Sequence, residues 1–231
     1  DFPHYLEHRA AGLDNLYIFT GTQATPDNIR KFHPNLIVNA TGSGPLLPPI
    51  KGLMDNIDKE GGNVYSILGM IHHINDFPQD LEGKKVAVIG GGAVGLDVVE
   101  FFAARKADIS IVEMMDQIGR DLDPVTKNDM KCQMKAHGVH QLTKTALLEV
   151  KEHSFLVKGS EGEYELPFDY GFVCLGMRAK GQLYPQLLEA FADDDVEIIN
   201  IGDSQRARRI IDGTMEGRNI LYHLTQRGYL D

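Results

Sequence analysis

The chain has 231 residues, of which 42% are hydrophobic and 24% are charged, and its formal net charge at pH 7 is −10. This composition is typical of a globular protein with one large domain or two small ones. The acidic balance argues against nucleic acid and anionic membrane surfaces as partners, because both require a basic face. No apolar run approaches the ~18 residues of a membrane span, and the first residues lack the basic and apolar parts of a secretory signal.

Only two cysteines occur, Cys132 and Cys174, and they are far apart in the sequence. Without a Cys-x-x-Cys pair, we expect no local redox disulfide and no cysteine-bound iron–sulfur cluster within the chain. Both are expected to be small buried side chains in a protein of the reducing cytoplasm. No spacing of residues predicts a metal site or a catalytic triad.

The first 55 residues contain one clear strand signal. A short helical stretch ends within residues 29–34, and the apolar run at residues 36–40 predicts a buried strand. This run leads into the turn-rich residues 41–45. The prolines and glycine of residues 48–52 then indicate a linker between domains.

Residues 56–176 alternate between strand and helix patterns. Apolar runs predict strands at residues 85–89, 108–113 and 170–175, and amphipathic stretches predict helices at residues 64–75, 93–106 and 124–137, the last capped by Gly138. The pattern indicates an α/β fold, with a Rossmann-like parallel sheet around residues 85–89 and helices on both of its faces.

Three short strand-like runs lie between the predicted helix at residues 124–137 and the predicted strand at residues 170–175. They occupy residues 147–150, 155–157 and 164–166, and glycines separate the last two, so we expect an antiparallel β-meander. In the last part of the chain, residues 177–231, an apolar run at residues 196–201 predicts a strand and residues 210–226 predict an amphipathic helix.

A glycine-rich turn joins the predicted strand 85–89 to the predicted helix 93–106. It reads Gly90-Gly91-Gly92-Ala93-Val94-Gly95 and fits the pattern G-x-G-x-x-G. The first glycine permits the tight turn, the second lets a pyrophosphate approach the backbone, and the third lets the helix pack on the sheet. The helix N-terminus offers N–H groups to the phosphates. This context predicts a dinucleotide site formed by Gly90, Gly92, Ala93, Val94 and Gly95.

An acidic residue ends the second strand of this unit. Glu113 follows Gly92 by 21 positions, where a carboxylate accepts hydrogen bonds from a ribose 2′-OH. A 2′-phosphate would place negative charge against the same carboxylate, and the residues after Glu113 contain no basic side chain before Arg120. The sequence therefore favours NADH over NADPH.

The flanking segments carry a further resemblance. Ala40-Thr41-Gly42-Ser43-Gly44-Pro45, followed by Pro48 and Gly52, resembles the A-T-G-S-x-P-x-x-P-x-x-G signature of two-dinucleotide-domain flavoproteins, and Gly202-Asp203 resembles their second flavin-contacting signature. The residues after it, Arg208, Arg209, Ile210, Asp212, Glu216 and Gly217, are similar to the C-terminal end of the 2-enoate reductase and 2,4-dienoyl-CoA reductase family, which are NADH:flavin oxidoreductases related to old yellow enzyme.

This resemblance implies a domain order and a set of cofactors. Residues 56–176 would be the NAD(P)H-binding domain, inserted into an FAD-type domain represented by residues 1–55 and 177–231. Gly176 would lie near the nicotinamide, and Thr41, Gly42, Gly202 and Asp203 would contact FAD. Hydride would pass from NADH to FAD, and electrons onward through an iron–sulfur cluster to FMN, which reduces an activated C=C bond.

The same resemblance implies parts beyond this chain. The chain begins at Asp1, so we expect the N-terminal FMN barrel and the rest of the FAD domain to belong to a longer parent protein. The incomplete FAD domain would expose a sheet edge, which makes residues 36–40 and 196–201 candidates for self-association. We expect no tightly bound FAD and no activity from this chain alone, and we assign it no catalytic residue.

Two other functions stay open from the sequence. One is a fragment of a disulfide reductase of the same fold, against which the lack of a Cys-x-x-Cys pair counts. The other is a non-catalytic regulatory module that binds a dinucleotide or ADP without turnover.

Overall fold

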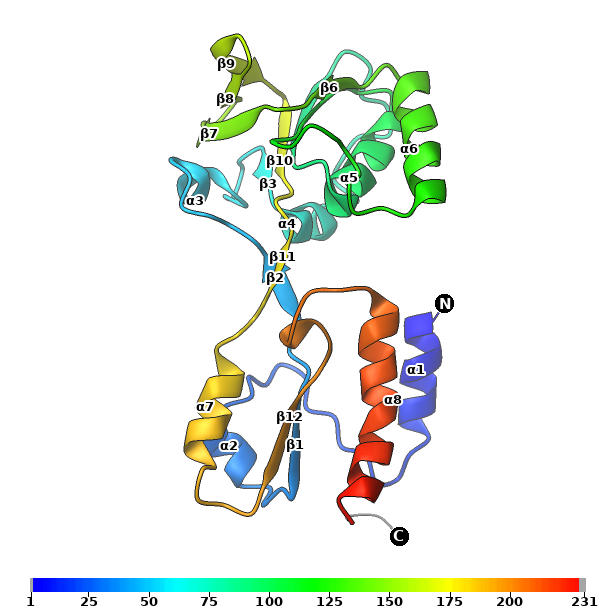
Figure 1. The fold of residues 1–231 in the computed structure, drawn as a ribbon, viewed down its shortest axis with the longest axis vertical. Coiled ribbons are helices and arrows are strands. Elements are labelled where there is room, and N and C mark those ends of the chain that lie inside the picture. Colours follow the sequence, from blue (N-terminus) through cyan, green and yellow to red (C-terminus); the bar gives the residue numbers. More distant parts are fainter. Residues whose placement is uncertain (1, 229–231) are drawn as a thin grey trace. The chain divides into compact units, whose positions relative to one another are not determined.

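The computed structural model describes residues 2–228, which form two compact units (Figure 1). Unit 1 contains the residues up to Asn39 together with Gly181–Asn200, and unit 2 contains Ala40–Lys180 and the residues from Ile201 onward. Residues 40–55 therefore group with the middle of the chain. The assignment of segments to FAD-type and NAD(P)H-binding domains stays a prediction.

Unit 1 is built on a two-stranded parallel sheet. Strand β1 (Leu36–Asn39) pairs with β12 (Glu197–Asn200). The two strands begin and end within a residue of the runs predicted at residues 36–40 and 196–201, whereas their pairing was not predicted. Helices α2 (Pro26–Arg30) and α7 (Leu183–Ala190) belong to the same unit, and their apolar side chains join the strands in a small core around Ile37, Leu187 and Phe191. Helix α1 (Phe2–Ala11) has no buried residue. The sequence pattern predicted neither α1 nor α7.

Unit 2 contains a five-stranded sheet in which every pair is parallel. Its strand order is β3 (Val64–Tyr65), β10 (Tyr170–Val173), β4 (Lys85–Ile89), β5 (Asp108–Val112) and β6 (His140–Leu142). Lys85 lies opposite Asp108 and Ile89 opposite Val112, so the two strands of the predicted dinucleotide unit are neighbours in register. The predicted α/β fold with a parallel sheet and an antiparallel meander is confirmed.

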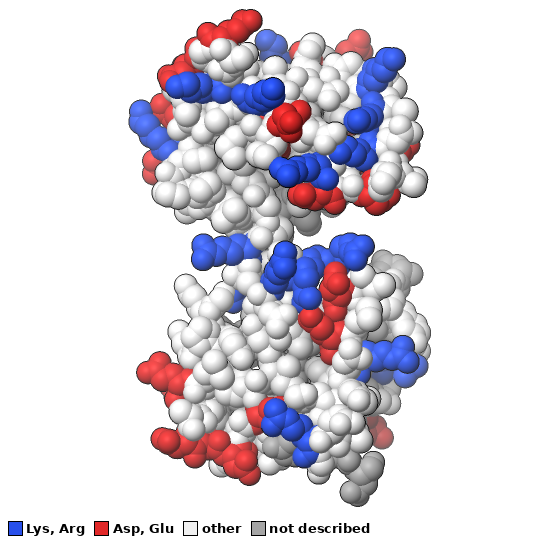
Figure 2. All heavy atoms as spheres, in the orientation of Figure 1, with Lys and Arg blue, Asp and Glu red and all other residues white. Residues whose placement is uncertain are grey.

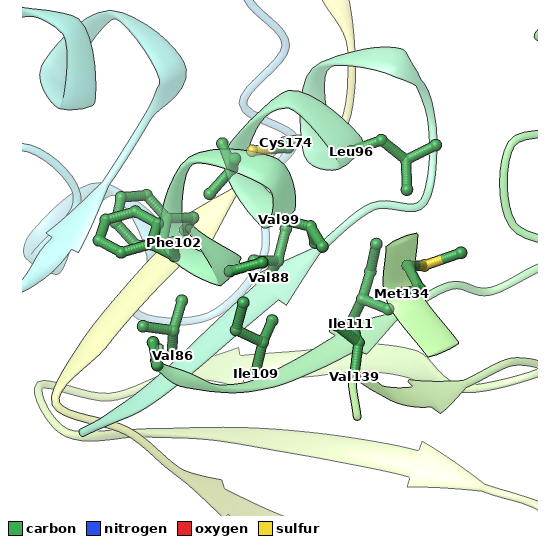
Figure 3. Packing of buried hydrophobic residues seen from close by; sticks show 14 of the residues in the cluster. Val86, Val88, Leu96, Val99, Phe102, Ile109, Ile111, Met134, Val139 and Cys174 are labelled. Atoms are coloured by element: carbon green, nitrogen blue, oxygen red, sulfur yellow. The ribbon is translucent and has the colours of Figure 1, made fainter. Parts of the chain in front are cut away.

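Helices cover one face of this sheet. They are α4 (Ile67–His72), α5 (Ala93–Ala103) and α6 (Pro124–Ala136). Figure 3 shows Val86, Val88, Ile109 and Ile111 of the strands gathered beneath side chains of α5 and α6, including Phe102, which is completely buried. Alternate residues of each strand share one face, so these positions form a continuous apolar layer.

The opposite face is covered differently from the prediction. The antiparallel meander β7 (Ala146–Val150), β8 (Ser154–Gly159) and β9 (Gly162–Pro167) packs there, with Phe155 and Val157 buried against Ala87 and Ile89 of β4. The short helix α3 (Leu53–Asn56) contributes only Leu53 to this core. The prediction of helices on both faces of the sheet was therefore wrong. An apolar sheet face can be covered by any element that has an apolar side, and here the meander covers it.

Two local expectations also need correction. Residues 64–75 are not one helix, because Val64 and Tyr65 pair with β10, and Ser66 then caps α4 by accepting a hydrogen bond from Gly69 N–H. Cys174 is buried as expected, but Cys132 is exposed on α6.

The remaining elements of unit 2 are a second small sheet, a short 3₁₀ turn and a long C-terminal helix. Strand β2 (Ser43–Pro45) pairs antiparallel with β11 (Met177–Ala179). A short 3₁₀ turn, η1 (Gly202–Ser204), precedes α8 (Ile210–Gln226), and α8 is the helix predicted over the same residues.

Figure 2 shows acidic and basic side chains on the visible face, with uncharged surface between them. Across residues 2–228, no helix combines the length and apolarity that a membrane crossing requires.

Candidate dinucleotide site

The glycine-rich turn lies between β4 and α5, and two of its glycines are demanded by the fold itself. Gly90 has φ of 107°, and a Cβ there would lie 2.1 Å from the carbonyl oxygen of Cys174. A Cβ on Gly95 would lie 1.9 Å from the carbonyl oxygen of Gly90. Any side chain at either position would displace backbone, so both glycines are explained without a ligand.

Gly92 is different, because the protein does not fill the space beside it. Its φ is −80°, and no heavy atom lies within 4 Å of a Cβ built there. The residue also starts α5 without a side-chain cap, whereas Asp123 caps α6 by accepting hydrogen bonds from Val125 and Thr126 N–H. An uncapped helix N-terminus beside open space is where phosphate groups bind in dinucleotide folds.

The carboxylate of Glu113 is held against this turn by two backbone donors. Its Oε2 accepts a hydrogen bond of 2.7 Å from Gly91 N–H, and its Oε1 accepts one of 2.8 Å from Met115 N–H. Each carboxylate oxygen keeps a further acceptor position. The two bonds therefore fix the direction of the carboxylate and leave it able to accept from a ligand hydroxyl.

A cavity of about 780 Å³ opens beside the turn, within the size range of cofactor sites. Its lining includes most of the predicted NADH residues: Gly90, Gly92, Ala93, Val94, Glu113 and Gly176. Gly95 is buried in the first turn of α5 and does not line the cavity. Gly176 has φ of 105° and open space around its Cβ position, so its backbone conformation explains the glycine there. The structure brings these residues together, and their contact with NADH stays a prediction.

The predicted FAD-side residues lie on the segments around β2 and η1. Asp203 accepts hydrogen bonds from Ser43 Oγ at 2.9 Å and from Arg208 N–H at 3.0 Å. Gly202, with φ of 62°, donates its N–H to Glu216 Oε2 at 2.6 Å. These bonds tie the start of α8 to the turn before it and to β2.

Thr41 and Gly42 precede β2. Thr41 is exposed and Gly42 has φ of 77°. The hydrogen bond from Gly202, followed by that from Arg208, holds the pKa of the Glu216 carboxyl below its usual range. Flavin contact by the four predicted residues stays a prediction.

Residues 5–202 match the family described as pyridine nucleotide-disulphide oxidoreductase. The chain belongs to this family. It is 28% identical to a NADH oxidase of Thermoanaerobacter brockii, over 89% of this chain and 30% of that protein. It is also 28% identical to a metal reductase of Desulforamulus reducens, over 86% of this chain and 32% of that protein.

The fold is shared with a solved 2-naphthoyl-CoA reductase in complex with 2-naphthoyl-CoA. The TM-score is 0.69 at 22% identity, over 85% of this chain and 28% of the other. The chain spans about a third of the length of the curated relatives it matches. Membership of the pyridine nucleotide-disulphide oxidoreductase family supports NAD(H) and FAD as the cofactors of an oxidoreductase.

Several residues that line the 780 Å³ cavity of this chain were not anticipated from its sequence. Ile50, Thr145 and Leu147 line it. Ile50 occupies a variable position of the signature at residues 40–52, and the other two lie in a segment without a motif, so nothing in the sequence marks these side chains. Arg120 lines a second, smaller cavity together with Gly92 and Glu113. The sequence pointed to Arg120 only as the first basic residue after Glu113, and its position beside Glu113 emerges from the loop conformation.

Two titratable side chains near the turn have shifted pKa values: Asp97, exposed on α5, and Cys174, buried in the wall of the larger cavity. Desolvation, with a smaller contribution from Glu100, raises the pKa of the Asp97 carboxyl above its usual range. Burial, with a smaller contribution from Asp97, raises the pKa of the Cys174 thiol to about 12, so this thiol stays protonated at neutral pH. Over residues 2–228, no group of three or more His, Cys, Asp or Glu side chains is arranged to hold a metal ion.

Proposed function

We propose that the chain is the NADH-binding portion of a flavin-dependent oxidoreductase that passes hydride from NADH to FAD and onward to an activated C=C bond. The observation that carries this proposal is the glycine turn with its open space at Gly92, placed beside the fixed carboxylate of Glu113. Family membership supports the pyridine nucleotide and the flavin. The signatures at residues 40–52 and 202–203 support a two-dinucleotide-domain flavoprotein. Residues 208–217 support the enoate and dienoyl-CoA reductase type, as does the fold shared with 2-naphthoyl-CoA reductase.

The residues of this chain act by positioning the dinucleotide. The N-terminus of α5 and the backbone at Gly92 receive the pyrophosphate, and Glu113 accepts from the adenosine ribose. Gly176 lines the same cavity, where it leaves room for the nicotinamide end. The cofactors supply the hydride chemistry itself, from the nicotinamide to the flavin. FMN and an iron–sulfur cluster belong, in this proposal, to an N-terminal barrel of the parent protein.

The first test is cofactor choice. Calorimetry should show tighter binding of NADH than of NADPH, because Glu113 accepts from a 2′-OH and repels a 2′-phosphate. Glu113→Ala should narrow the difference by about 1–3 kcal/mol, the contribution of a hydrogen bond to a charged group. Equal or tighter binding of NADPH by the unmutated chain would contradict the proposal.

The second test concerns flavin and turnover. The purified chain should show no stoichiometric flavin spectrum and no oxidation of NADH with a dye acceptor, because its one glycine-rich phosphate turn is assigned to NADH. Thr41, Gly42, Gly202 and Asp203 would touch FAD from one side only, with few contacts to offset the entropy of binding. A stoichiometric flavin spectrum, or steady turnover without added flavin, would show that the FAD site is complete.

The rival reading is a regulatory module that binds ADP or a dinucleotide without hydride transfer. It predicts that the full-length parent protein binds NADH without bleaching a bound flavin. Flavin reduction by NADH in the parent protein would exclude it.

Self-association through the edges of the β1–β12 sheet stays a prediction. Sedimentation velocity of the chain at several concentrations measures it.

A further inference from the structure

Two asparagine side chains meet between β1 and β12, the neighbouring strands of unit 1 (Figure 1). Asn39 is only 3% exposed, although the three residues before it in β1 are all apolar. Its Nδ2 donates a hydrogen bond of 2.8 Å to Oδ1 of Asn200, the residue directly opposite it in β12. Burial of an amide is costly unless it has such a partner, so the opposite strand explains the polar residue in this apolar run.

The apolar contacts of the two strands do not fix their register by themselves. Ile37 lies opposite Ile198, and both belong to the small core with α2 and α7. If β12 slipped by two residues, Ile37 would lie opposite Val196, which is also apolar and belongs to the same core. Such a slip keeps every side chain on its own face, because the side chains of a strand alternate. Each strand has only four residues, so few ladder hydrogen bonds oppose it.

The amide pair does oppose this slip. After it, Asn39 would lie opposite the apolar Ile198, and its hydrogen bond to Asn200 would be broken. The loss of a partner in a buried position is costly for a polar group, so the paired amides favour the observed register. A single buried asparagine selects the register of coiled coils in the same way.

The register sets the alignment of the segments that follow the two strands. The predicted FAD-side pair Thr41-Gly42 comes two and three residues after Asn39. The other predicted pair, Gly202-Asp203, comes two and three residues after Asn200. The two pairs therefore follow the amide contact at equal distances along the chain. A slip of two residues would shift one strand end against the other by about 6.6 Å, at about 3.3 Å per residue.

We propose that Asn39 and Asn200 are positioning residues, whose hydrogen bond sets the register of β1 against β12 and thereby aligns the two segments predicted to contact FAD. The hydrogen bond of 2.9 Å from Ser43 Oγ to Asp203 joins the same two segments and depends on that alignment. The flavin part of the inference rests on the proposed function. The register part concerns this chain with or without FAD.

Cysteine pairs measure the register directly. Val38→Cys with Ile199→Cys places two thiols opposite each other in the observed register, and Val38→Cys with Glu197→Cys does so only after a slip of two residues. Opposite neighbours are close enough for a disulfide to form on mild oxidation, whereas diagonal neighbours, about 7–8 Å apart, are not. All chains also carry Cys132→Ser, because Cys132 is exposed.

The test compares the two cysteine pairs with and without the amides. With both asparagines present, the 38–199 pair should form the disulfide and the 38–197 pair should form little. Asn39→Leu combined with Asn200→Leu makes the core face apolar throughout. The yield of the 38–197 disulfide should then rise about tenfold or more, the change expected when a buried hydrogen bond no longer discriminates.

A matched control separates register from general stability. Ile37→Val with Ile198→Val removes one methyl group from each strand of the same sheet and leaves the amide pair intact. This control should lower Tm without raising the yield of the 38–197 disulfide. The double leucine variant should show the reverse pattern, because apolar packing replaces the amide pair at little cost in stability.

The flavin part is tested in the full-length parent protein. Asn39→Leu with Asn200→Leu should lower its flavin content at least about threefold while NADH still binds, because the FAD-side segments lose their alignment. The valine control should keep the flavin content of the unmutated parent.

The outcomes separate the two levels of the argument. A 38–197 yield that stays low in the double leucine variant, or that rises equally in the valine control, would overturn the register role. A raised yield with unchanged flavin content in the parent would overturn the alignment of the FAD-side segments. Absence of flavin from the unmutated parent would overturn the proposed function and the flavin part with it, and the disulfide yields would still decide the register.

Discussion

The contrast between Gly90 and Gly92 gives the sharpest check on the dinucleotide site. Gly90→Ala places a Cβ 2.1 Å from the Cys174 carbonyl oxygen at φ of 107°, whereas Gly92→Ala places one in open space at φ of −80°. The left-handed backbone costs about 1–3 kcal/mol for an L-residue. Displacement of packed backbone costs about 1–3 kcal/mol more. Gly90→Ala should therefore lower the free energy of unfolding by roughly 2–6 kcal/mol.

Gly92→Ala should behave in the opposite way. A helix N-cap prefers glycine to alanine, but alanine also restricts the unfolded chain, and the two effects are each within about 1 kcal/mol and oppose one another. The fold should be kept, while the new methyl group occupies the space that we assign to the pyrophosphate. We expect affinity for NADH to fall about tenfold or more, which corresponds to about 1.4 kcal/mol.

Thermal unfolding and calorimetry with NADH on both variants distinguish the two roles. At about 2–4 °C per kcal/mol for a protein of this size, Gly90→Ala should lower Tm by roughly 4 °C at least, and Gly92→Ala should move it by a few degrees at most. NADH affinity that is unchanged in Gly92→Ala, with Tm also unchanged, would refute the assignment of the open space to a phosphate. An unchanged Tm for Gly90→Ala would refute the steric argument for the turn.

Three further outcomes are expected. Phe102→Ala should lower the free energy of unfolding by about 3–5 kcal/mol in denaturant titrations, because the ring is completely buried between α5 and the sheet; a loss below about 1 kcal/mol would contradict that packing. The hydrogen bond from Lys85 N–H, and after it the one from Lys84 Nζ, lowers the pKa of the Asp169 carboxyl in the folded protein. The ionised carboxylate therefore stabilises the fold at pH values above the ordinary pKa of a carboxyl, and this stabilisation is lost as the pH falls through the lowered pKa. Asp169→Asn should accordingly lower Tm at pH 7, and its deficit against the unmutated chain should shrink under acid conditions; a deficit independent of pH would contradict the ionic role. With a thiol reagent at pH 7, the exposed Cys132 should be alkylated and Cys174 should not, since burial keeps its thiol protonated and inaccessible; rapid modification of two thiols in the folded chain would contradict the burial of Cys174.

The unit from β4 through the glycine turn and α5 to β5 could be predicted from sequence because each of its signals is local. The turn needs Gly90 at a positive φ, and the helix needs its apolar stripe within a single run of residues. The meander strands and α8 were found for the same reason. Each predicted range depends on a pattern that repeats within about ten residues, so no distant partner was needed to recognise it.

The corrections arise where a pattern has more than one physical solution. Val64 and Tyr65 are apolar in either a helix or a strand, and pairing with β10 decides between the two. The outer face of β4 needs an apolar cover, and only the path of the chain shows that Phe155 and Val157 of the meander provide it.

The sequence by itself therefore determined the class of fold, the glycine turn after β4 and the acidic residue that ends the second strand of this unit, since these depend on residue type at fixed short spacing. Only the tertiary structure decided that Glu113 is pinned by two backbone N–H groups and that Arg120 stands beside it. The hydrogen bond between Gly119 and Gly91 sets that position, and it joins residues 28 apart in sequence. Contacts of this kind depend on how packed elements bring loops together, and a single sequence carries no local signal for them.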